Sequence, residues 1–398
     1  MATDPVESIR STEHQTPFTA NLRKRLVNLA HLEPSVEHPY LSVYVDWRPE
    51  GENPNVRPGK ITLENKFSEH RRKLKDSDID RRGFDADVER IDAFLEDGIN
   101  PAVHGIFILS CDSKNVFETV LLAMPLDTRL TVSPTPDLRM LVRVIEDFPR
   151  FAVLHADQHD ASVFIINRGS AESTRELDSN DYPSKSSAGG WSQRRFQARQ
   201  EERVSHFAKA VAEETRKLLD ETHIKMLVLS AGEVFGSALQ EEFHQSVKER
   251  IVGEIHLDIQ ASESEIVHAA LPVVEQAERN READTIRTLE DALGAGNQGA
   301  GGVDDVLIAL ESGQVMTLLM AEDFEANGWA DYGLNLYGAG EIPSEHPAAG
   351  DRDALVKIDL AEEFVRLALS TSATVEIVPS RESARLHKHG GVGAILRY

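Results

Sequence analysis

Apolar and polar residues alternate with two different periods along the chain, and together these patterns predict an α/β protein. Short apolar runs bounded by turn-forming residues are typical of buried strands. Such runs predict strands at residues 41–47, 104–110, 115–122, 151–157, 162–169, 225–231, 251–258, 315–321, 374–378 and 392–397. Because these strands are interleaved with helical patterns, we expect sheets whose faces are covered by helices.

The helical pattern is clearest between residues 193 and 219. There Phe196, Val204, Phe207, Val211 and Leu218 recur at intervals that place them on one face of a helix. Weaker patterns of the same kind predict helices at 61–75, 84–96, 136–148, 233–247, 262–292, 303–311 and 354–369. The Ser/Gly-rich segment 179–192 and the segment 327–353 lack both periods, so we expect loops there.

The chain has 398 residues, which is too long for one ordinary hydrophobic core. The order of the expected elements divides it into three parts. We predict an N-terminal α/β domain at 1–149, a middle domain at 150–262 and a C-terminal domain at 263–398.

The composition restricts the classes of partner. The net charge of −24, from 43 basic and 67 acidic residues, disfavours non-specific binding to DNA. No apolar run approaches the ~18 residues that a membrane-spanning helix needs, and the polar start does not resemble a signal peptide. Cys111 is the single cysteine, so neither an internal disulfide nor a cysteine zinc site is expected. We therefore predict a cytoplasmic protein without a membrane, a metal or another cofactor.

Two basic stretches stand out from this acidic background. One contains Arg71, Arg72, Lys73 and Lys75; the other, 193–203, contains Arg194, Arg195 and Arg199. Each is compatible with a solvated helix face or with binding to the phosphates of RNA.

The second basic stretch follows an unusual loop, Ser186–Arg195, with the sequence SSAGGWSQRR. Gly189 and Gly190 allow backbone conformations that extend a loop away from its domain. Trp191 beside arginines is typical of surfaces that stack on RNA bases and bind phosphates, and Gln193 can orient a water or a ribose hydroxyl. The alternative is that Trp191 folds back onto the core and the arginines only begin a surface helix.

Two further motifs have plainer interpretations. The run Gly294–Gly299 matches G-x-G-x-x-G, but the pattern before it is helical, which favours a linker over a dinucleotide site. His155, Asp157, His159 and Asp160 crowd one expected hairpin. They could hold a metal for phosphodiester hydrolysis, or Asp could simply stabilise the turn.

Three segments carry a resemblance to a known family. The first is the glycine loop with glutamine, followed by Arg194-Arg195-Phe196 and a long helix. The second is Val303–Ala321, a helix that ends in A-L-x-x-G and is followed by a strand, and the third is the ending His389–Tyr398 (HGGVGAILRY). All three resemble the archaeo-eukaryotic class-1 release factor and Pelota superfamily. The resemblance covers about residues 150–398 and is greatest to the bacterial branch, which includes Balon-type ribosome hibernation factors.

The resemblance implies an RNase-H-like middle domain and an L7Ae-like C-terminal domain. It also implies that Gly189, Gly190 and Gln193 enter the peptidyl-transferase centre, that Arg194 and Arg195 pack on rRNA near the P-site tRNA, and that the C-terminal domain contacts a translational GTPase. In the family, the glutamine places water against the ester that joins peptide and tRNA.

The sequence departs from the family pattern in three ways. Trp191 and Ser192 separate the glycines from Gln193, which displaces the amide by up to about 7 Å in an extended chain. No N-I-K-S or Y-x-C-x-x-x-F pattern occurs, and the C-terminal mini-domain cysteines of some relatives are missing from 327–353. We therefore favour a factor that occupies the A site of idle or stalled ribosomes without decoding stop codons. A peptidyl-tRNA hydrolase using Gln193 and a metal-dependent RNA endonuclease are the alternatives.

Overall fold

The computed structural model describes residues 22–51, 56–74, 78–147, 150–167, 170–178, 193–296 and 298–398; at 78–80, 146–147, 170–173, 178 and 193–201 it describes the backbone only. The described residues form two compact units. Unit 1 combines residues up to 146 with residues 286–398, and unit 2 comprises residues 147–285. The division into three domains stays a prediction.

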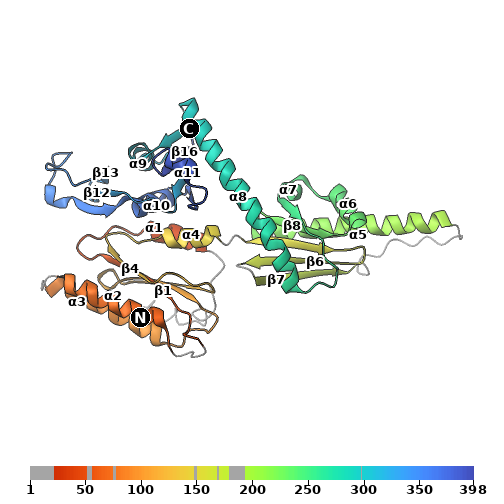
Figure 1. Cartoon of the computed structure of the whole chain (residues 1–398), viewed down its shortest axis with the longest axis horizontal. Helices are drawn as coiled ribbons and strands as arrows, with labels where there is room; N and C mark the ends of the chain where they lie inside the picture. The colour runs from red at the N-terminus through yellow and green to blue at the C-terminus, as the bar shows by residue number, and fades with distance from the viewer. Residues whose placement is uncertain are drawn as a thin grey trace, which may run out of the picture. The chain divides into compact units, whose positions relative to one another are not determined.

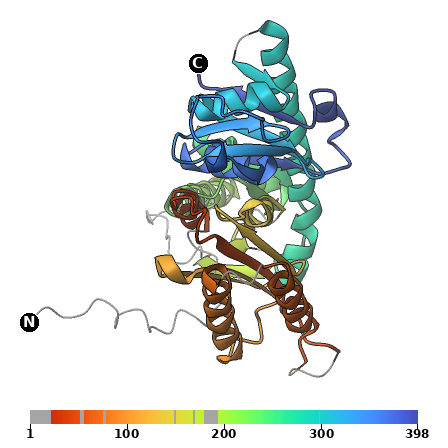
Figure 2. The ribbon, with the colours of Figure 1, turned by 90° about the vertical axis from the view of Figure 1, so that its left-hand side faces the viewer.

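The first part of unit 1, here called the N-part (22–146), is built on an antiparallel sheet with the order β3-β2-β1-β4. Its strands are β1 (Tyr40–Asp46), β2 (Gly105–Cys111), β3 (Val116–Leu122) and β4 (Arg129–Ser133). One face packs on α2 (Pro58–Lys73) and α3 (Asp78–Glu96), and α1 (Leu22–Ala30) and α4 (Arg139–Asp147) lie on the other (Figures 1 and 2). Apolar side chains alternate along β1 between these two faces, so both faces are buried.

The rest of unit 1, the C-part (286–398), contains two sheets with the orders β10-β16-β11-β15 and β13-β12-β14. Its strands are β10 (Gly299–Gly301), β11 (Val315–Ala321), β12 (Asn327–Asp331), β13 (Leu336–Ala339), β14 (Val356–Asp359), β15 (Thr374–Val378) and β16 (Val392–Leu396). Its helices are α9 (Val303–Glu311), α10 (Leu360–Ser370) and the short α11 (Ala384–His387). Helix α10 contacts α1, and a single apolar cluster includes residues of both parts.

Unit 2 is a mixed sheet with the order β7-β6-β5-β8-β9 and helices on both faces. Its strands are β5 (Phe151–Ala156), β6 (Asp160–Asn167), β7 (Ser170–Asp178), β8 (Leu227–Ala231) and β9 (Ile251–Glu254). The helices α5 (Gln193–Thr222), α6 (Glu233–Glu242) and α7 (Gln245–Lys248) share one core with the sheet, and the start of α8 (Glu263–Ala295) packs on the other face. Strands β5, β8 and β9 are parallel, as expected where helices connect them.

All ten predicted strands and most predicted helices are confirmed, with differences at their ends. Helix α1 and strands β4, β10 and β14 were not predicted. The predicted helix 233–247 is wrong in part, because the chain breaks at Phe243 and His244, whose side chain accepts a hydrogen bond from the backbone N–H of Ser246 and starts α7.

The loop expected at 327–353 is also wrong in part, since β12 and β13 form a hairpin there. Its strands contain glycine, which hides the alternation of apolar residues. Gly338 is required, because a Cβ atom at this position would lie 2.2 Å from the indole of Trp329 on the paired strand.

Phe207 should be the most sensitive position of the unit 2 core. It is 1% exposed, and its ring stacks on Phe235 at 5.6 Å between ring centroids. We expect Phe207→Ala to lower the free energy of unfolding of unit 2 by roughly 3–5 kcal/mol. The exposed Lys209→Ala on the same helix should change it by less than about 0.5 kcal/mol. Urea denaturation followed by circular dichroism measures both, and equal effects would refute this account of the core.

Candidate functional site

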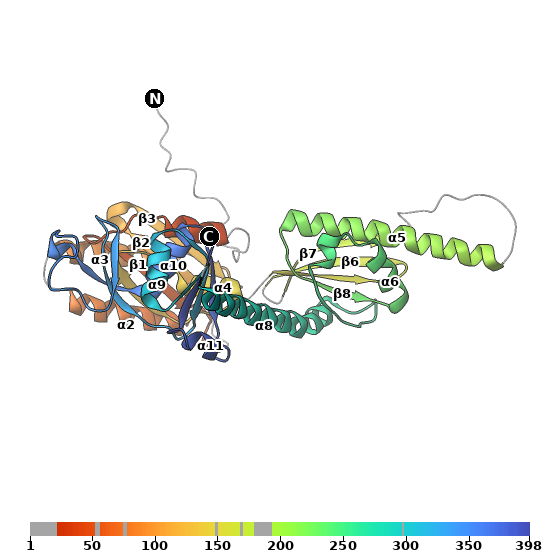
Figure 3. The same cartoon turned by 90° about the horizontal axis from the view of Figure 1, so that it is seen from above.

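The N-terminal end of α5 is the feature that connects the predicted loop to the fold. The helix begins at Gln193 and has 30 residues, and among the side chains that the structure describes, Val204 is the first to pack on the unit 2 core. The 11 residues from 193 to 203 therefore extend roughly 16 Å ahead of this contact. Figures 1 and 3 show this end of α5 running past the edge of the sheet.

The other two thirds of α5 hold this extension in place. Phe207, Ala208, Val211 and Leu219 are buried against the sheet and α6. Ion pairs add to this apolar contact: Arg175 of β7 lies 3.3 Å from Glu214, and Asp220 lies 2.8 Å from Arg250. A helix that is fixed along most of its length can present its free end at a defined place.

The predicted site residues fall at and before this end. Gly189, Gly190 and Trp191 lie outside the described residues. Gln193, Arg194, Arg195 and Arg199 lie in the first two turns of α5, where only the backbone is described. The structure thus brings the four described positions together on one helical segment.

This segment is positively charged in an acidic protein. Residues 193–203 hold four arginines and two glutamates, a net charge of +2 against −24 for the whole chain. Arg195, Arg199 and Arg203 are spaced by four residues, so their like charges repel one another along the helix. The partial positive charge of a helix N-terminus adds to them. An anionic partner such as a phosphate backbone would relieve this repulsion.

The second basic patch lies at the end of α2, and Lys75 is outside the described residues. Arg71 donates to Asp85 at 2.7 Å and lies over the ring of Phe84, while Lys73 is paired with Glu69. Arg72 is exposed. Binding of RNA by this patch stays a prediction, and two of its cations already have carboxylate partners.

The hairpin residues that suggested a metal site make hydrogen bonds that stabilise the fold. Asp157 Oδ1 accepts the backbone N–H groups of His159 and Asp160 at 2.7 and 2.8 Å, as in a typical Asp turn. His155 is buried, with Nε2 3.1 Å from the carbonyl oxygen of Asp258 and Nδ1 2.8 Å from Ser230 Oγ. Since a carbonyl only accepts, Nε2 carries the proton and Nδ1 accepts from Ser230. Among the described residues, no group of three or more metal-ligating side chains is present.

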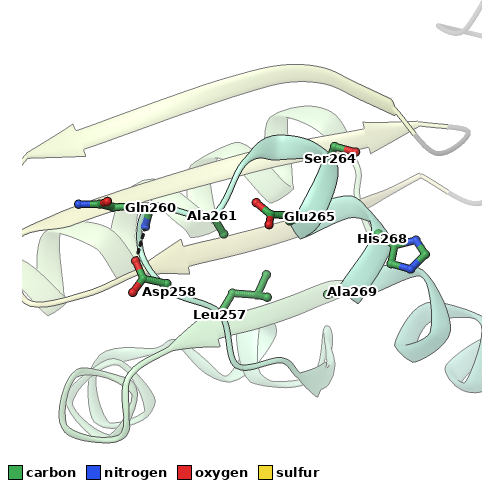
Figure 4. Close-up of a pocket in the computed structure, with 8 residues that line it drawn as sticks. All are labelled: Leu257, Asp258, Gln260, Ala261, Ser264, Glu265, His268 and Ala269. Atoms are coloured by element: carbon green, nitrogen blue, oxygen red, sulfur yellow. Dashed lines mark hydrogen bonds between the residues drawn. The ribbon is translucent and has the colours of Figure 1, made fainter.

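An open hollow lies at the start of α8, where its lining includes Asp258, Glu265 and His268 (Figure 4). Its carboxylates are engaged locally: Asp258 Oδ1 accepts from the backbone N–H of Gln260 at 2.9 Å, and Glu265 accepts from the backbone N–H and the hydroxyl of Ser262 in a capping box. These contacts explain the polar lining through the fold alone.

The sequence patterns did not indicate a cavity of about 270 Å³ in the N-part. Its walls come from five separate segments and include His70, Phe84, Asp87 and Cys111. Asp87 accepts from Ser110 Oγ and from the backbone N–H of Asp112, and burial raises the pKa of its carboxyl group. No local motif predicts such a cavity, because only the fold brings these segments together.

The middle of the chain has a direct match among protein families. Residues 136–275 match the model of "Bacterial archaeo-eukaryotic release factor family 10". The chain is 26% identical over 299 residues to peptide chain release factor subunit 1 of Thermococcus onnurineus, covering 66% of this chain and 69% of that protein. The corresponding protein of Archaeoglobus fulgidus is 23% identical over 345 residues, which cover 79% and 83% of the two chains.

The chain resembles the bacterial branch of the archaeo-eukaryotic release factor and Pelota superfamily, most directly over residues 136–275.

Solved structures of this superfamily also match. Dom34 of S. cerevisiae, described as a translation termination-like factor that interacts with Hbs1, has a TM-score of 0.41 and 12% identity, covering 74% of this chain and 80% of its own. A ribosome-bound archaeal Pelota with ABCE1 has a TM-score of 0.37 and 13% identity, covering 96% and 95%. In the part of the chain that the structure describes, no helix has the length and apolarity that crossing a bilayer requires.

A substitution at Asp157 distinguishes the turn from a metal site. Asp157→Asn keeps the side-chain oxygen that accepts both backbone N–H groups, so the free energy of unfolding should change by less than about 0.5 kcal/mol. Asp157→Ala removes both hydrogen bonds and should cost about 1–2 kcal/mol. Thermal unfolding with and without a chelator measures these effects. A chelator-dependent loss of stability in the wild type that Asp157→Asn abolishes would argue for a metal instead.

Proposed function

We propose that this protein is a ribosome-binding factor that occupies the A site of idle or stalled ribosomes and does not read stop codons. The observation that carries the proposal is the end of α5, a positively charged segment that extends beyond the core directly after the Gly189–Trp191 loop. In this proposal, Trp191 stacks on rRNA bases and Arg194, Arg195 and Arg199 bind phosphates.

The family resemblance supports this role. The matched relatives are peptide chain release factors, and one neighbour in structure is described as ribosome-bound. The missing codon-reading motifs and the inserted Trp191 and Ser192 favour binding over termination. On a large anionic surface, a basic tip on an acidic body restricts contact to the tip, because the body is repelled.

The domain architecture is part of the same proposal. We assign an RNase-H-like domain to 150–262, supported by its mixed sheet with helices on both faces. An L7Ae-like domain at 263–398 would contact a translational GTPase, as Dom34 interacts with Hbs1. The N-terminal domain, 1–149, would carry the second basic patch at Arg71, Arg72, Lys73 and Lys75.

Ribosome binding gives the first test. We expect Arg194→Ala/Arg195→Ala to weaken binding to 70S ribosomes roughly 10–100-fold and to reduce the dependence of log K on log salt by about 1.5. Lys209→Ala/Lys225→Ala removes the same charge from exposed positions of unit 2 and should leave binding within about twofold. Sucrose-gradient sedimentation at several salt concentrations measures both. Equal binding by the two double variants would contradict the proposal.

Hydrolysis of peptidyl-tRNA is the second candidate, because Gln193 is the first residue of α5 and directly follows the loop. If Gln193 positions water, Gln193→Ala should slow release of a labelled peptide from stalled ribosomes by about 10²-fold or more while ribosome binding persists. Trp191→Ala is the matched loop variant. Wild-type release no faster than that of Gln193→Ala would leave binding as the function.

A further inference from the structure

A cluster of buried charges joins the N-part to the C-part of unit 1. Arg139 of α4 donates to the carbonyl oxygens of Glu322 and Phe324, both at 2.9 Å, and its backbone N–H donates to Glu362 of α10 at 3.3 Å. Nearby, Thr135 donates to Glu363 at 3.3 Å. Polar groups thus cross this contact at several points beside the shared apolar cluster.

Two carboxyl groups meet in the middle of this contact, Asp137 from the N-part and Glu362 from the C-part. Their residues are 1% and 8% exposed. Arg129 is 3.3 Å from Asp137 and 3.8 Å from Glu362, so one guanidinium faces both acids. Burial above all, and then Asp137, raise the pKa of Glu362 well above its usual value.

Each of the two carboxyl groups has one oxygen that accepts a hydrogen bond and one that does not. Asp137 Oδ2 accepts from Thr131 Oγ1 at 2.7 Å, and Glu362 Oε2 accepts from the backbone of Arg139. Asp137 Oδ1 and Glu362 Oε1 are buried and have no hydrogen-bond partner among the described residues. A proton held by Glu362 and donated to Asp137 would satisfy both oxygens at once, whereas two ionised carboxylates would leave both unsatisfied.

We propose that Asp137 and Glu362 form a proton-dependent latch: a shared proton keeps the N-part closed on the C-part, and its loss favours an open form. This goes beyond ribosome binding, because it concerns only the contact within unit 1. The closed form buries α10 against α1, and the open form would free this face of α10.

The direction of the pH dependence follows from the raised pKa of Glu362. A carboxyl group whose pKa is higher in the closed form binds its proton more tightly there. Its contribution to closure is complete below its usual pKa and is lost as the pH rises through the raised value. Between these two limits, the ratio of closed to open molecules should fall by up to tenfold for each pH unit.

The other charged and titratable groups around Glu362 come from several elements of unit 1. Arg129 comes from β4, Arg139 from α4, Tyr44 from β1, Asp137 from the chain before α4, and Asp359 from the residue before α10. Both arginines remain charged throughout, and burial raises the pKa of Tyr44 well above its usual value. Glu362 is thus the group whose protonation responds to closure, with a pKa that burial raises well above its usual value.

Closure can be measured by energy transfer between dyes in the full chain. The dyes are attached to Glu96→Cys in the N-part and Leu334→Cys in the C-part, in a Cys111→Ser background. Both positions are accessible, since the side chain of Glu96 is 71% exposed and Leu334 is 56% exposed. We expect the closed fraction of the parent chain to fall as the pH rises from about 5 to 9. Glu362→Gln, whose amide donates to Asp137 without titrating, should stay closed throughout this range.

Asp137→Asn tests the same proton from the other side, since its amide can donate to an ionised Glu362. Because the burial of Glu362 remains, the pH dependence should become weaker than in the parent chain, and this variant serves if Glu362→Gln does not fold. Glu363→Gln is the control. Its carboxylate is already paired with Arg366 at 2.6 Å, so the pH dependence should remain. A parent chain whose closed fraction is constant with pH, an unchanged dependence in Glu362→Gln, or its loss in Glu363→Gln would each overturn the latch.

Discussion

The packing of α5 on the sheet of unit 2 is the interaction on which the proposed site depends. A helix of 30 residues that starts after a Gly/Ser-rich loop has a fixed position only if part of it is buried. Phe207, Val211 and Leu219 supply that burial, and the stacked rings of Phe207 and Phe235 tie α5 to α6. Among the described side chains, packing on the core begins at Val204, and the helical segment that carries the arginines runs past the edge of the sheet (Figures 1 and 3). The apolar spacing of α5 therefore determines how the helix packs, and this packing determines where its charged end lies.

Much of this could be predicted from the sequence. The spacing from Phe196 to Leu218 predicts the helix, and β5, β6 and β8 of unit 2 contain apolar runs that leave little ambiguity. The predictions failed where tertiary contact decides the structure. Leu22, Leu26 and Leu29 of α1 are buried in a core that α1 shares with the N-part sheet and with α10, which is more than 300 residues away. The hairpin of β12 and β13 needs Gly338 beneath Trp329, and no local pattern reveals that pairing.

The candidate site divides in the same way. Residue types and spacing single out Gly189–Arg195, and the structure adds the extended start of α5 to that motif. The hairpin acids look like metal ligands in the sequence, yet Asp157 closes a turn and His155 links β5 to β8 and the chain before α8. No sequence pattern indicates the Asp137–Glu362 pair, because the two residues are separated by 225 positions and come together only in the folded unit.

A structure of this protein bound to the ribosome tests the central claim most directly. The account predicts that the end of α5 lies in the large subunit, with Trp191 stacked on an rRNA base, Arg194 and Arg195 on phosphates, and Gln193 near the end of the P-site tRNA. It would be contradicted by a complex in which this end of α5 faces solvent while another surface of the protein makes the contact with rRNA.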